Sequence, residues 1–343
     1  MKKGVSVSTD HIEPSLRSEF WREMARPLFE LLPLEPGEDH YRGAVQSVPF
    51  GRMTLASISF NRQHYNRNRR TILRSGLDDY LLQLVVAGTL RADCDGIPIA
   101  ADVGDICVFD LARPFTSRAE PGSRITMLVP RDPIDRAAGG RSLHGHRLAA
   151  DTPVTRLLAG CLTHFHAVAG DLDQADAAAM EDSVAGLLAA ALTRKPIVHG
   201  DAAPIVSEGI RRRIARHIDD HIADTTLSPR SIMREFQISR AHLYRLFAEE
   251  GGIATLIRDK RLDAAFRFLA LERNATLPIA DLGYRLGFPN PSRFSKAFRA
   301  RFAMTPREAR NGGAENLNQI LGGNDIHHHL ADVIARIPPS RRG

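Results

Sequence analysis

The chain of 343 residues contains no long hydrophobic run. None of its apolar stretches approaches the roughly 18 residues that a membrane-spanning helix requires. Its first residues, Met1 to Ser6, include two lysines but no apolar region behind them, so no signal peptide is expected. The sequence therefore predicts a cytoplasmic protein with no membrane partner.

Cysteine is scarce as well. Only Cys94, Cys107 and Cys161 occur, widely spaced and without a CxxC pair. This pattern excludes a disulfide scaffold and a cysteine-rich zinc module, and it fits a reducing compartment.

The recurrent enzyme motifs are also missing: the chain has no phosphate loop, no GxSxG and no dinucleotide fingerprint. His64 has no partner at a two- or four-residue step. The two HxH pairs, His144 with His146 and His164 with His166, lack a carboxylate at a metal-ligand interval. We therefore predict that the protein is not an enzyme, with no catalytic residues, metal or cofactor.

What the sequence does contain is an ordinary globular composition, with 43% hydrophobic and 25% charged residues, and enough length for two domains. Its net charge of +6 is unevenly placed. Pro204 to Arg310 holds 20 Lys and Arg against 12 Asp and Glu, a net +8, whereas the remainder carries −2. Only the C-terminal third is therefore expected to meet a polyanion, although a solvated arginine-rich face would give the same balance.

Short β-branched and apolar runs recur between about Gly43 and Pro130, separated by turn signals such as Val103-Gly104-Asp105. Met53–Phe60 and Tyr80–Val86 are examples. This spacing predicts a small antiparallel barrel or sandwich. A helix is predicted before it, from Ser15 to Leu32, and carries the only tryptophan, Trp21.

An alanine-rich helical region follows, from about 151 to 193. It contains an apolar seam at alternating spacings of four and three, made of Ala177, Met180, Val184, Leu187 and Ala191. The seam fits two alternatives equally, packing on the chain's own barrel or forming a dimer interface. Residues 194–204 then have the composition of a linker.

An internal repeat dominates Val206 to Arg310. Ile232–Ile238 aligns with Leu282–Phe288 at an offset of 50, and Leu243–Phe247 aligns with Phe294–Phe298 at an offset of 51. The extra residue falls in the turn. Each copy has the pattern of a helix, a tight turn and a second helix with one buried and one polar face, as in helix-turn-helix motifs. Ser228, Ser239 and Asn290 are expected to cap the helices that follow them.

These residues carry a family resemblance. The run from Ile279 to Arg310 closely resembles the signature of AraC/XylS-family transcription regulators, and Leu227-Ser228-Pro229 with Ile238–Phe247 resembles the family's first motif. More loosely, Gly43–Pro130 looks like the family's effector-binding barrel, and the helical insert resembles regulators of aromatic catabolism. Two residues depart from the pattern: Ala303 stands where glycine is frequent, and Ala309 where an aromatic is frequent. An alanine forced into a left-handed backbone would cost about 1 kcal/mol.

On the first recognition helix the outward positions are Arg240, Ala241, Tyr244 and Arg245. The resemblance assigns base contacts to the last three. Arg245 is the best single candidate because a guanidinium can bond guanine O6 and N7 together, although a phosphate contact is the alternative.

On the second recognition helix a less specific surface is expected. Its outward positions are Pro291, Ser292, Ser295 and Lys296, with Arg293 and Arg299 flanking them. Arg299 and Arg301 are predicted to anchor phosphates, and Phe294 and Phe298 to be core residues.

The predicted fold is α+β: a cupin-like antiparallel barrel with helices, and an all-α domain with two helix-turn-helix motifs. Residues 1–200 form the effector-binding and dimerisation domain, 205–311 the DNA-binding domain, and 312–343 a tail without an assigned role. The resemblance places the effector inside the barrel, where Arg70, His64 and Tyr80 could supply contacts. Each of them fits an ordinary strand residue better, so no ligand residue is assigned.

The resemblance implies a sequence-specific regulator, an activator, that binds double-stranded DNA, works with RNA polymerase and forms a homodimer. It responds to a small-molecule effector, for which an aromatic compound is a candidate. Two alternatives stay open. One is control by a protein partner, which an N-terminal domain without a cavity would favour. The other is a barrel enzyme fused to a DNA-binding domain, which stoichiometric metal would favour.

Overall fold

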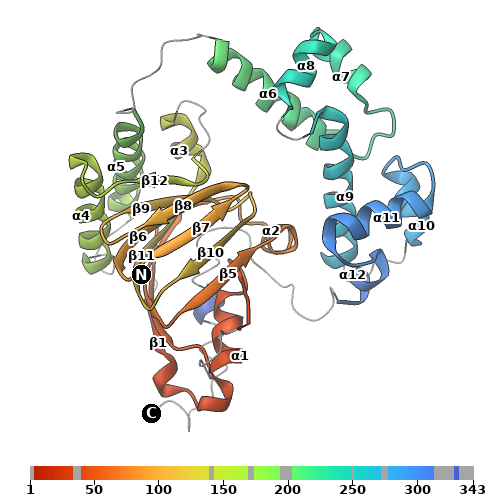
Figure 1. Ribbon diagram of the computed structural model, residues 1–343. Coiled ribbons are helices and arrows are strands. Elements are labelled where there is room, and N and C mark those ends of the chain that lie inside the picture. Colours follow the sequence, from red (N-terminus) through yellow and green to blue (C-terminus); the bar gives the residue numbers. More distant parts are fainter. Residues whose placement is uncertain are drawn as a thin grey trace. The chain divides into compact units, whose positions relative to one another are not determined.

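The computed structural model describes residues 4–33, 40–138, 143–168, 174–193, 203–248, 251–271, 277–312 and 328–331. The chain divides into two compact units (Figure 1). The first, here called the sheet unit, comprises Met1–Ile197 together with Gln319–Gly343. The second, the helical unit, comprises Val198–Asn318.

Two antiparallel sheets form the sheet unit. The seven-stranded sheet has the order β1 (Val5–Ser8), β3 (Gly43–Phe50), β4 (Met53–Phe60), β11 (Gly122–Val129), β6 (Tyr80–Ala87), β9 (Ile106–Asp110) and β12 (His146–Leu148). The five-stranded sheet has the order β2 (Glu30–Leu31), β5 (Gln63–Arg67), β10 (Phe115–Ala119), β7 (Leu90–Cys94) and β8 (Ile97–Ala101). The predicted antiparallel architecture is confirmed, and its strands extend beyond 43–130 at both ends.

Strand alternation gives the larger sheet two different faces. On β11, Ile125, Met127 and Val129 belong to a core cluster shared with the helices α3 (Arg131–Ala137), α4 (Pro153–Val168) and α5 (Gln174–Thr193). The intervening Arg124, Thr126 and Leu128 point to the other side and line a cavity. The helices therefore cover one face of the larger sheet (Figure 1).

The apolar seam of α5 packs within the chain. Val184 is fully buried in the cluster that contains Met127 and Val129, and Met180, Leu187 and Ala191 pack against it. The side chain of Ala177 lies outside the described residues. Of the two alternatives for the seam, the structure shows the intramolecular one.

The helix expected over Ser15–Leu32 is shorter than predicted. Helix α1 spans Pro14–Ala25, and the chain then forms the short strand β2. Pro27 explains the early end, because proline has no N–H to donate and its ring clashes with the preceding turn. The shorter helix leaves Leu28 and Phe29 free to pack on the sheets with Met24.

The helical unit contains the two predicted helix-turn-helix pairs. Its helices are α6 (Ala203–Asp220), α7 (Pro229–Phe236), α8 (Arg240–Leu246), α9 (Ile253–Leu271), α10 (Ile279–Arg285), α11 (Pro291–Phe302) and α12 (Pro306–Gly312). In the first pair the core is largely aliphatic, with Ile214 and Ile218 of α6 against Leu243 of α8. In the second it is aromatic, because Phe294, Phe298 and Phe302 of α11 stack with one another and on Phe266 of α9. None of the described helices is both long enough and apolar enough to cross a membrane.

Candidate nucleic-acid interface and internal cavity

The turns of the two helix-turn-helix copies have the same backbone design. Gln237 ends α7 with a left-handed backbone, φ 51°, and Gly287 occupies the equivalent place in the second copy with φ 74°. The next residue of each turn closes onto the first helix. Ile238 N donates to Met233 O at 3.2 Å, and Phe288 N donates to Gly283 O at 3.0 Å. The repeat predicted from an offset of 50 residues is therefore present in the hydrogen bonds.

Each recognition helix begins at a side-chain cap. Ser239 Oγ accepts from His242 N at 3.2 Å, and Asn290 Oδ1 accepts from Arg293 N at 2.8 Å. The two caps are 51 residues apart, so the extra residue lies in the second turn, as predicted. Ser228 caps α7 in a reciprocal capping box with Ser231. All three predicted caps are confirmed, and they fix where α7, α8 and α11 begin.

On α8 the four predicted outward residues, Arg240, Ala241, Tyr244 and Arg245, are all exposed, while Leu243 is buried in the core of the first copy. Arg240 lies over the ring of Tyr244, with 5.4 Å between the guanidinium carbon and the ring centroid. Tyr244 stays on the surface in this pair, with 37% of its area exposed. This face presents one cation that stacks and a second, Arg245, that does not.

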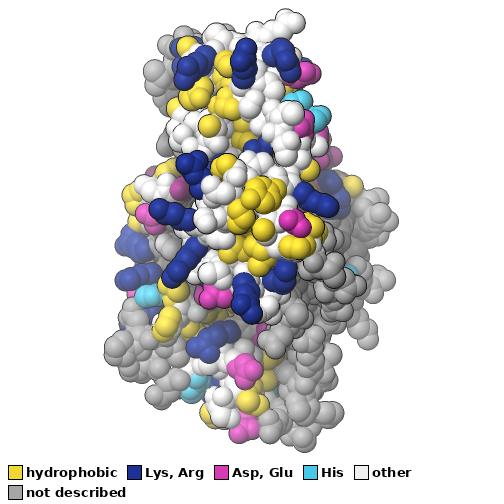
Figure 2. All heavy atoms as spheres, turned by 90° about the vertical axis from the view of Figure 1, so that its right-hand side faces the viewer, with side chains coloured by type: hydrophobic (Ala, Val, Ile, Leu, Met, Phe, Trp, Pro, Cys, Tyr) yellow, Lys and Arg dark blue, Asp and Glu magenta, His cyan; other side chains and the backbone are white. Residues whose placement is uncertain are grey.

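On α11 the exposed residues are more polar and smaller. Ser292, Arg293, Lys296 and Arg299 are exposed, and Pro291 and Ser295 are half-buried. Phe294 and Phe298 are fully buried, as predicted for core residues. Lys and Arg side chains are distributed over the face that the helical unit presents in Figure 2.

The expectation for Arg301 is wrong. Instead of extending toward a phosphate, its guanidinium donates to Asp263 Oδ1 at 2.7 Å and to Asp259 Oδ2 at 2.6 Å, both on α9. Burial alone would lower the pKa of Arg301, but the hydrogen bonds and charge of Asp263, with those of Asp259, raise it. Arg301 thus joins α11 to α9 and is not available as a phosphate anchor.

A basic groove between the two copies was not foreseen from the sequence. It has a volume of about 740 Å³ and is lined by residues of α9, α11, the turn before α11 and the start of α7. Four cationic side chains contribute to it: Arg258 and Arg261 of α9, and Arg293 and Lys296 of α11. The signal was the charge pattern of α9 itself, with Arg258 and Arg261 three residues apart on one helix face.

Arg261 also ties the two copies together. Its Nη2 donates to Asp224 O at 2.9 Å and Leu227 O at 3.2 Å, just before the first copy. A Cβ at Gly287, in the second turn, would lie 2.7 Å from its Nη1. Burial lowers the pKa of Arg261, and the charge of Asp224 opposes that effect.

The two departures from the family pattern have different outcomes. Ala303 ends α11 with φ 52°, the left-handed backbone that glycine adopts without cost. Ala309 is buried, so the position usually given to an aromatic is part of the core. Ala303 therefore has the left-handed backbone for which a cost in stability is predicted.

The sheet unit encloses a cavity of about 100 Å³ between its sheets and α1. A cavity of about 150 Å³ is enough to hold benzene. Arg70, His64 and Tyr80, the residues considered from sequence, are absent from its walls. The described residues that line it are Trp21, Met24, Ala25, Leu28, Phe29, Val45, Ser47, Thr54, Ala56, Ile58, Phe60, Tyr65, Leu81, Gln83, Leu90, Ser117, Ala119, Arg124, Thr126, Leu128 and Leu330.

The polar atoms of Trp21 and Tyr65, two aromatic residues of the cavity wall, are hydrogen-bonded to a neighbouring side chain. Gln63 Oε1 accepts from Trp21 Nε1 at 2.9 Å and from the Tyr65 hydroxyl at 2.5 Å. Burial raises the pKa of Tyr65, so its hydroxyl stays neutral. Both residues therefore offer the cavity their ring surfaces.

A segment from the far end of the sequence completes the cavity wall. Leu330 is buried in the same core cluster as Met24, and His329 Nε2 lies 2.7 Å from Glu23 O on α1. Residues 328–331 are thus part of the sheet unit, although they follow the helical unit in sequence.

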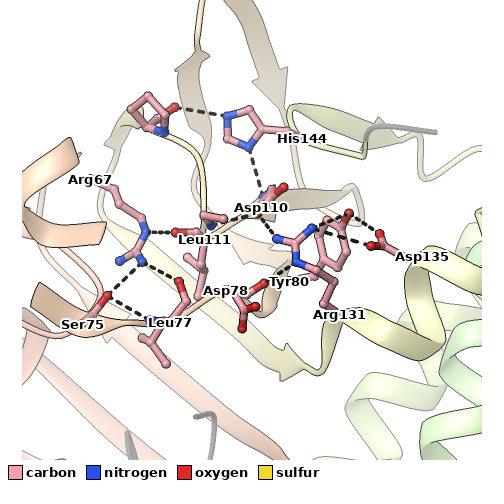
Figure 3. Close-up of polar contacts among 12 residues, drawn as sticks. Arg67, Ser75, Leu77, Asp78, Tyr80, Asp110, Leu111, Arg131, Asp135 and His144 are labelled. Atoms are coloured by element: carbon pink, nitrogen blue, oxygen red, sulfur yellow. Dashed lines mark hydrogen bonds and ion pairs between the residues drawn. The ribbon is translucent and has the colours of Figure 1, made fainter. Parts of the chain in front are cut away.

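Outside the cavity, the sheet unit contains a polar network that fastens its loops (Figure 3). Arg67 is buried and donates to the main chain of Leu111 and Leu77 and to Ser75 Oγ. Asp110 pairs with Arg131, and its N–H donates to His144 Nδ1 at 3.1 Å. His144 is therefore part of this scaffold, and no group of three His, Cys, Asp or Glu suited to a metal occurs among the described residues.

Comparison with known proteins agrees with both units. Residues 21–193 match the model of the AraC-binding-like domain, and residues 232–312 match that of a helix-turn-helix domain. The transcriptional activator NphR of Rhodococcus sp. is 25% identical over 272 residues, covering 78% of this chain and 80% of that protein. The arabinose operon regulatory protein of Escherichia coli K12 is 31% identical over 111 residues, covering 32% of this chain and 37% of that protein.

Among solved structures, the AraC-like transcriptional activator CuxR has the same fold, with a TM-score of 0.52 and 19% identity over 77% of this chain and 95% of that chain. The AraC-binding-like model alone spans half of the sequence, and the second model covers the paired recognition helices. The chain therefore belongs to the AraC family of DNA-binding transcription regulators.

Proposed function

We propose that the protein is a cytoplasmic transcription activator that reads DNA with α8 and α11 and is controlled by a small molecule in the cavity of the sheet unit. The observation that carries the DNA-binding part is the matched pair of recognition helices, each with a buried core face and an exposed polar face. The relative NphR is a transcriptional activator, which supports the same direction of regulation here. As an activator it works with RNA polymerase and has no enzymatic activity of its own.

In this proposal α8 supplies most of the base recognition. Arg245 bonds a guanine edge, and Tyr244, stacked under Arg240, makes an apolar contact with a neighbouring base. Ala241 allows close approach to the groove.

Helix α11 positions the protein more than it reads sequence. Ser292, Ser295 and Lys296 face the groove, Arg293 and Arg299 bond phosphates, and Pro291 sets the start of the helix. The basic groove lined by Arg258 and Arg261 receives the backbone between the two major-groove contacts.

The cavity supports a small-molecule effector over a protein partner, because a concave, mostly apolar space is typical of ligand sites. The effector must bind the DNA-competent state more tightly than the idle state in order to shift the population. A homodimer stays a prediction without an assigned surface, since the α5 seam packs on its own sheet.

The test is selection of binding sites from a random duplex library by the full-length protein. We expect two conserved blocks with centres about 10–10.5 base pairs apart, one for each recognition helix. Arg245→Ala should relax one base position in the α8 block. The matched control is Arg267→Ala. Arg267 is exposed and lies nine residues after Arg258, which places it on the face of α9 opposite to the basic groove. Loss of only one block, or no enrichment, would contradict the two-helix proposal.

The direction of regulation needs a second measurement. The selected site is placed upstream of a weak promoter that drives a reporter. We expect expression to rise when the protein is present, and a fall would identify a repressor.

A further inference from the structure

The cavity contains one charged side chain, Arg124, and among the described residues that line it there is no Asp, Glu, Lys or His. Arg124 is 2% exposed, and no carboxylate is paired with it in the described part of the chain. A buried cation without a counter-charge is costly, so proteins normally pair it. The missing partner is the first indication of what the cavity holds.

The hydrogen bonds of Arg124 leave one edge of its guanidinium without an acceptor. Nη1 donates to Ala87 O at 2.6 Å and Ser123 O at 2.9 Å, and Nη2 donates one N–H to Thr89 O at 2.9 Å. Nε is buried and has no partner among the described residues. Nε–H and the second Nη2–H lie on one edge, which is the fork that a carboxylate accepts in a bidentate contact.

Arg67, the other buried arginine among the described residues of the sheet unit, is bonded differently. All its donors are used: Nε bonds Leu111 O, Nη1 bonds two main-chain oxygens, and Nη2 bonds Ser75 Oγ and Leu77 O (Figure 3). The two arginines are comparably buried. The difference is the free edge of Arg124.

The local backbone directs Arg124 into the cavity. The pairing of β11 with β6 shifts register between Ser123 and Arg124, and such bulges re-aim a side chain. The guanidinium carbon then lies 5.2 Å from the centroid of the Phe60 ring, which is part of the cavity wall. Gln83 and Ser117, also in the wall, make no hydrogen bond to a described residue through their side chains and remain open to a ligand.

We propose that the effector is a single-ring carboxylic acid, whose carboxylate pairs with the Nε–Nη2 edge of Arg124 and whose apolar body lies against Trp21 and Tyr65. The inference rests on the proposed function of the sheet unit as a sensor and names the ligand class of its cavity. The cavity volume of about 100 Å³ is below the roughly 150 Å³ of a cavity that holds benzene, so it excludes a body larger than one ring. The ligand supplies the negative charge that the protein omits.

The test uses a matched series on the full-length protein: phenylacetate, phenylacetamide and 2-phenylethylamine, with 3-phenylpropanoate and its amide as a longer pair. Binding is followed through the fluorescence of Trp21, the only tryptophan of the chain and part of the cavity wall. We expect each acid to bind at least about 100-fold more tightly than its amide, because a buried charge pair is exchanged for a neutral contact. We expect no signal from the amine, since it would bring a second cation to Arg124.

The variants separate ligand recognition from a structural role. Arg124→Lys keeps the charge without the fork, and we expect it to weaken acid binding about tenfold and leave amide binding unchanged. Arg124→Met should abolish the preference for the acid over the amide. The control is Arg118→Met on β10, whose side chain is exposed and outside the cavity. If Arg124→Met fails to fold, the ligand series on the unmodified protein and Arg124→Lys decide the question.

Three outcomes would overturn the inference, and they differ in what they leave standing. Equal or tighter binding of the amides, or binding of the amine, rejects the carboxylate but leaves the small-molecule sensor. Acid binding that persists unchanged in Arg124→Lys rejects the role of Arg124 alone. Silence of Trp21 toward every compound rejects the single-ring carboxylic acid and leaves the small-molecule sensor to be tested with ligands of other classes.

Discussion

The two helix-turn-helix copies of this protein share a backbone and differ in almost everything exposed. Both turns contain a left-handed residue, both close with the same main-chain hydrogen bond, and both recognition helices start at a side-chain cap. Yet α8 presents Arg240, Tyr244 and Arg245, whereas α11 presents Ser292 and Lys296. The comparison shows which positions the fold requires and which it leaves free to differ.

Their cores differ too. The first copy packs isoleucines of α6 and α7 against α8, and the second stacks the phenylalanines of α11 on Phe266. The second also has an ion-pair network, Arg301 to Asp263 and Asp259, whereas in the first the pair of Lys260 with Asp219 joins α9 to α6. The second copy is therefore attached to α9 by an aromatic core and by an ion-pair network.

Removing that network gives the largest expected effect. Arg301→Ala removes the two hydrogen bonds that Arg301 donates to the carboxylate of Asp263, a residue only 3% exposed, which should destabilise the helical unit by about 3 kcal/mol. Urea unfolding followed by far-ultraviolet circular dichroism measures the loss, with Trp21 fluorescence as a reference for the sheet unit. Arg299→Ala, an exposed neighbour on α11, is the control and should change stability by less than about 0.5 kcal/mol. Equal effects of the two variants would contradict the network.

The difference in DNA recognition is the next largest. Arg245→Ala should weaken binding to a selected site by about 2 kcal/mol, because a bidentate base contact is lost. Ser295→Ala, on α11, should cost less than about 1 kcal/mol, since a serine bonds base or phosphate with a single weak contact. Titration of both variants at one salt concentration tests the contrast. A larger loss for Ser295→Ala would reverse the assignment of roles.

The turns offer a smaller test. Gly287→Ala should destabilise the helical unit by about 1–2 kcal/mol, because alanine is strained at φ 74° and its Cβ would displace Arg261. Gln237→Ala replaces one non-glycine residue by another at the matching turn, so its effect should stay within about 0.5 kcal/mol. Thermal unfolding of both variants measures the difference. A neutral Gly287→Ala would show that Arg261 moves aside without loss.

The smallest effect is a gain. Ala303→Gly should stabilise the helical unit by about 0.5–1 kcal/mol, since the left-handed backbone at φ 52° costs glycine nothing. The comparison variant is Ala300→Gly within the same helix, which should destabilise by a similar amount. If glycine relieves strain at position 303, the unfolding midpoints of the two variants should shift in opposite directions. A loss of stability in Ala303→Gly would show that the flexibility of glycine in the unfolded chain outweighs the relief of strain.

The helix-turn-helix pair could be predicted because its signals are local. The repeat, the caps at Ser228, Ser239 and Asn290, and the inward phenylalanines all follow from spacing within a few residues, and each is present in the structure. The exposed face of α8 follows from the same helical period. The sequence was sufficient to predict features that depend on residue spacing within a single helix or turn.

What could not be predicted depends on contacts between distant segments. The engagement of Arg301 needs two aspartates on α9, about forty residues earlier, and the basic groove needs α9 beside α11. The cavity draws on α1, both sheets and Leu330, so Arg70, His64 and Tyr80 could not be ruled out from strand pattern alone. Arg124 did have a signal, an arginine at an inward position of a strand, but only the pairing of β11 shows which side is inward.

Leu330 has a consequence for how the chain is divided. Because residues 328–331 belong to the sheet unit, the helical unit is an insertion within it, with covalent connections to the sheet unit both before and after. A fragment that stops after α5 lacks part of its own cavity wall, and a tag fused close behind Leu330 sits beside that wall. To produce the sheet unit alone, the two segments that flank the helical unit should therefore be joined by a short linker, instead of truncating the chain after α5.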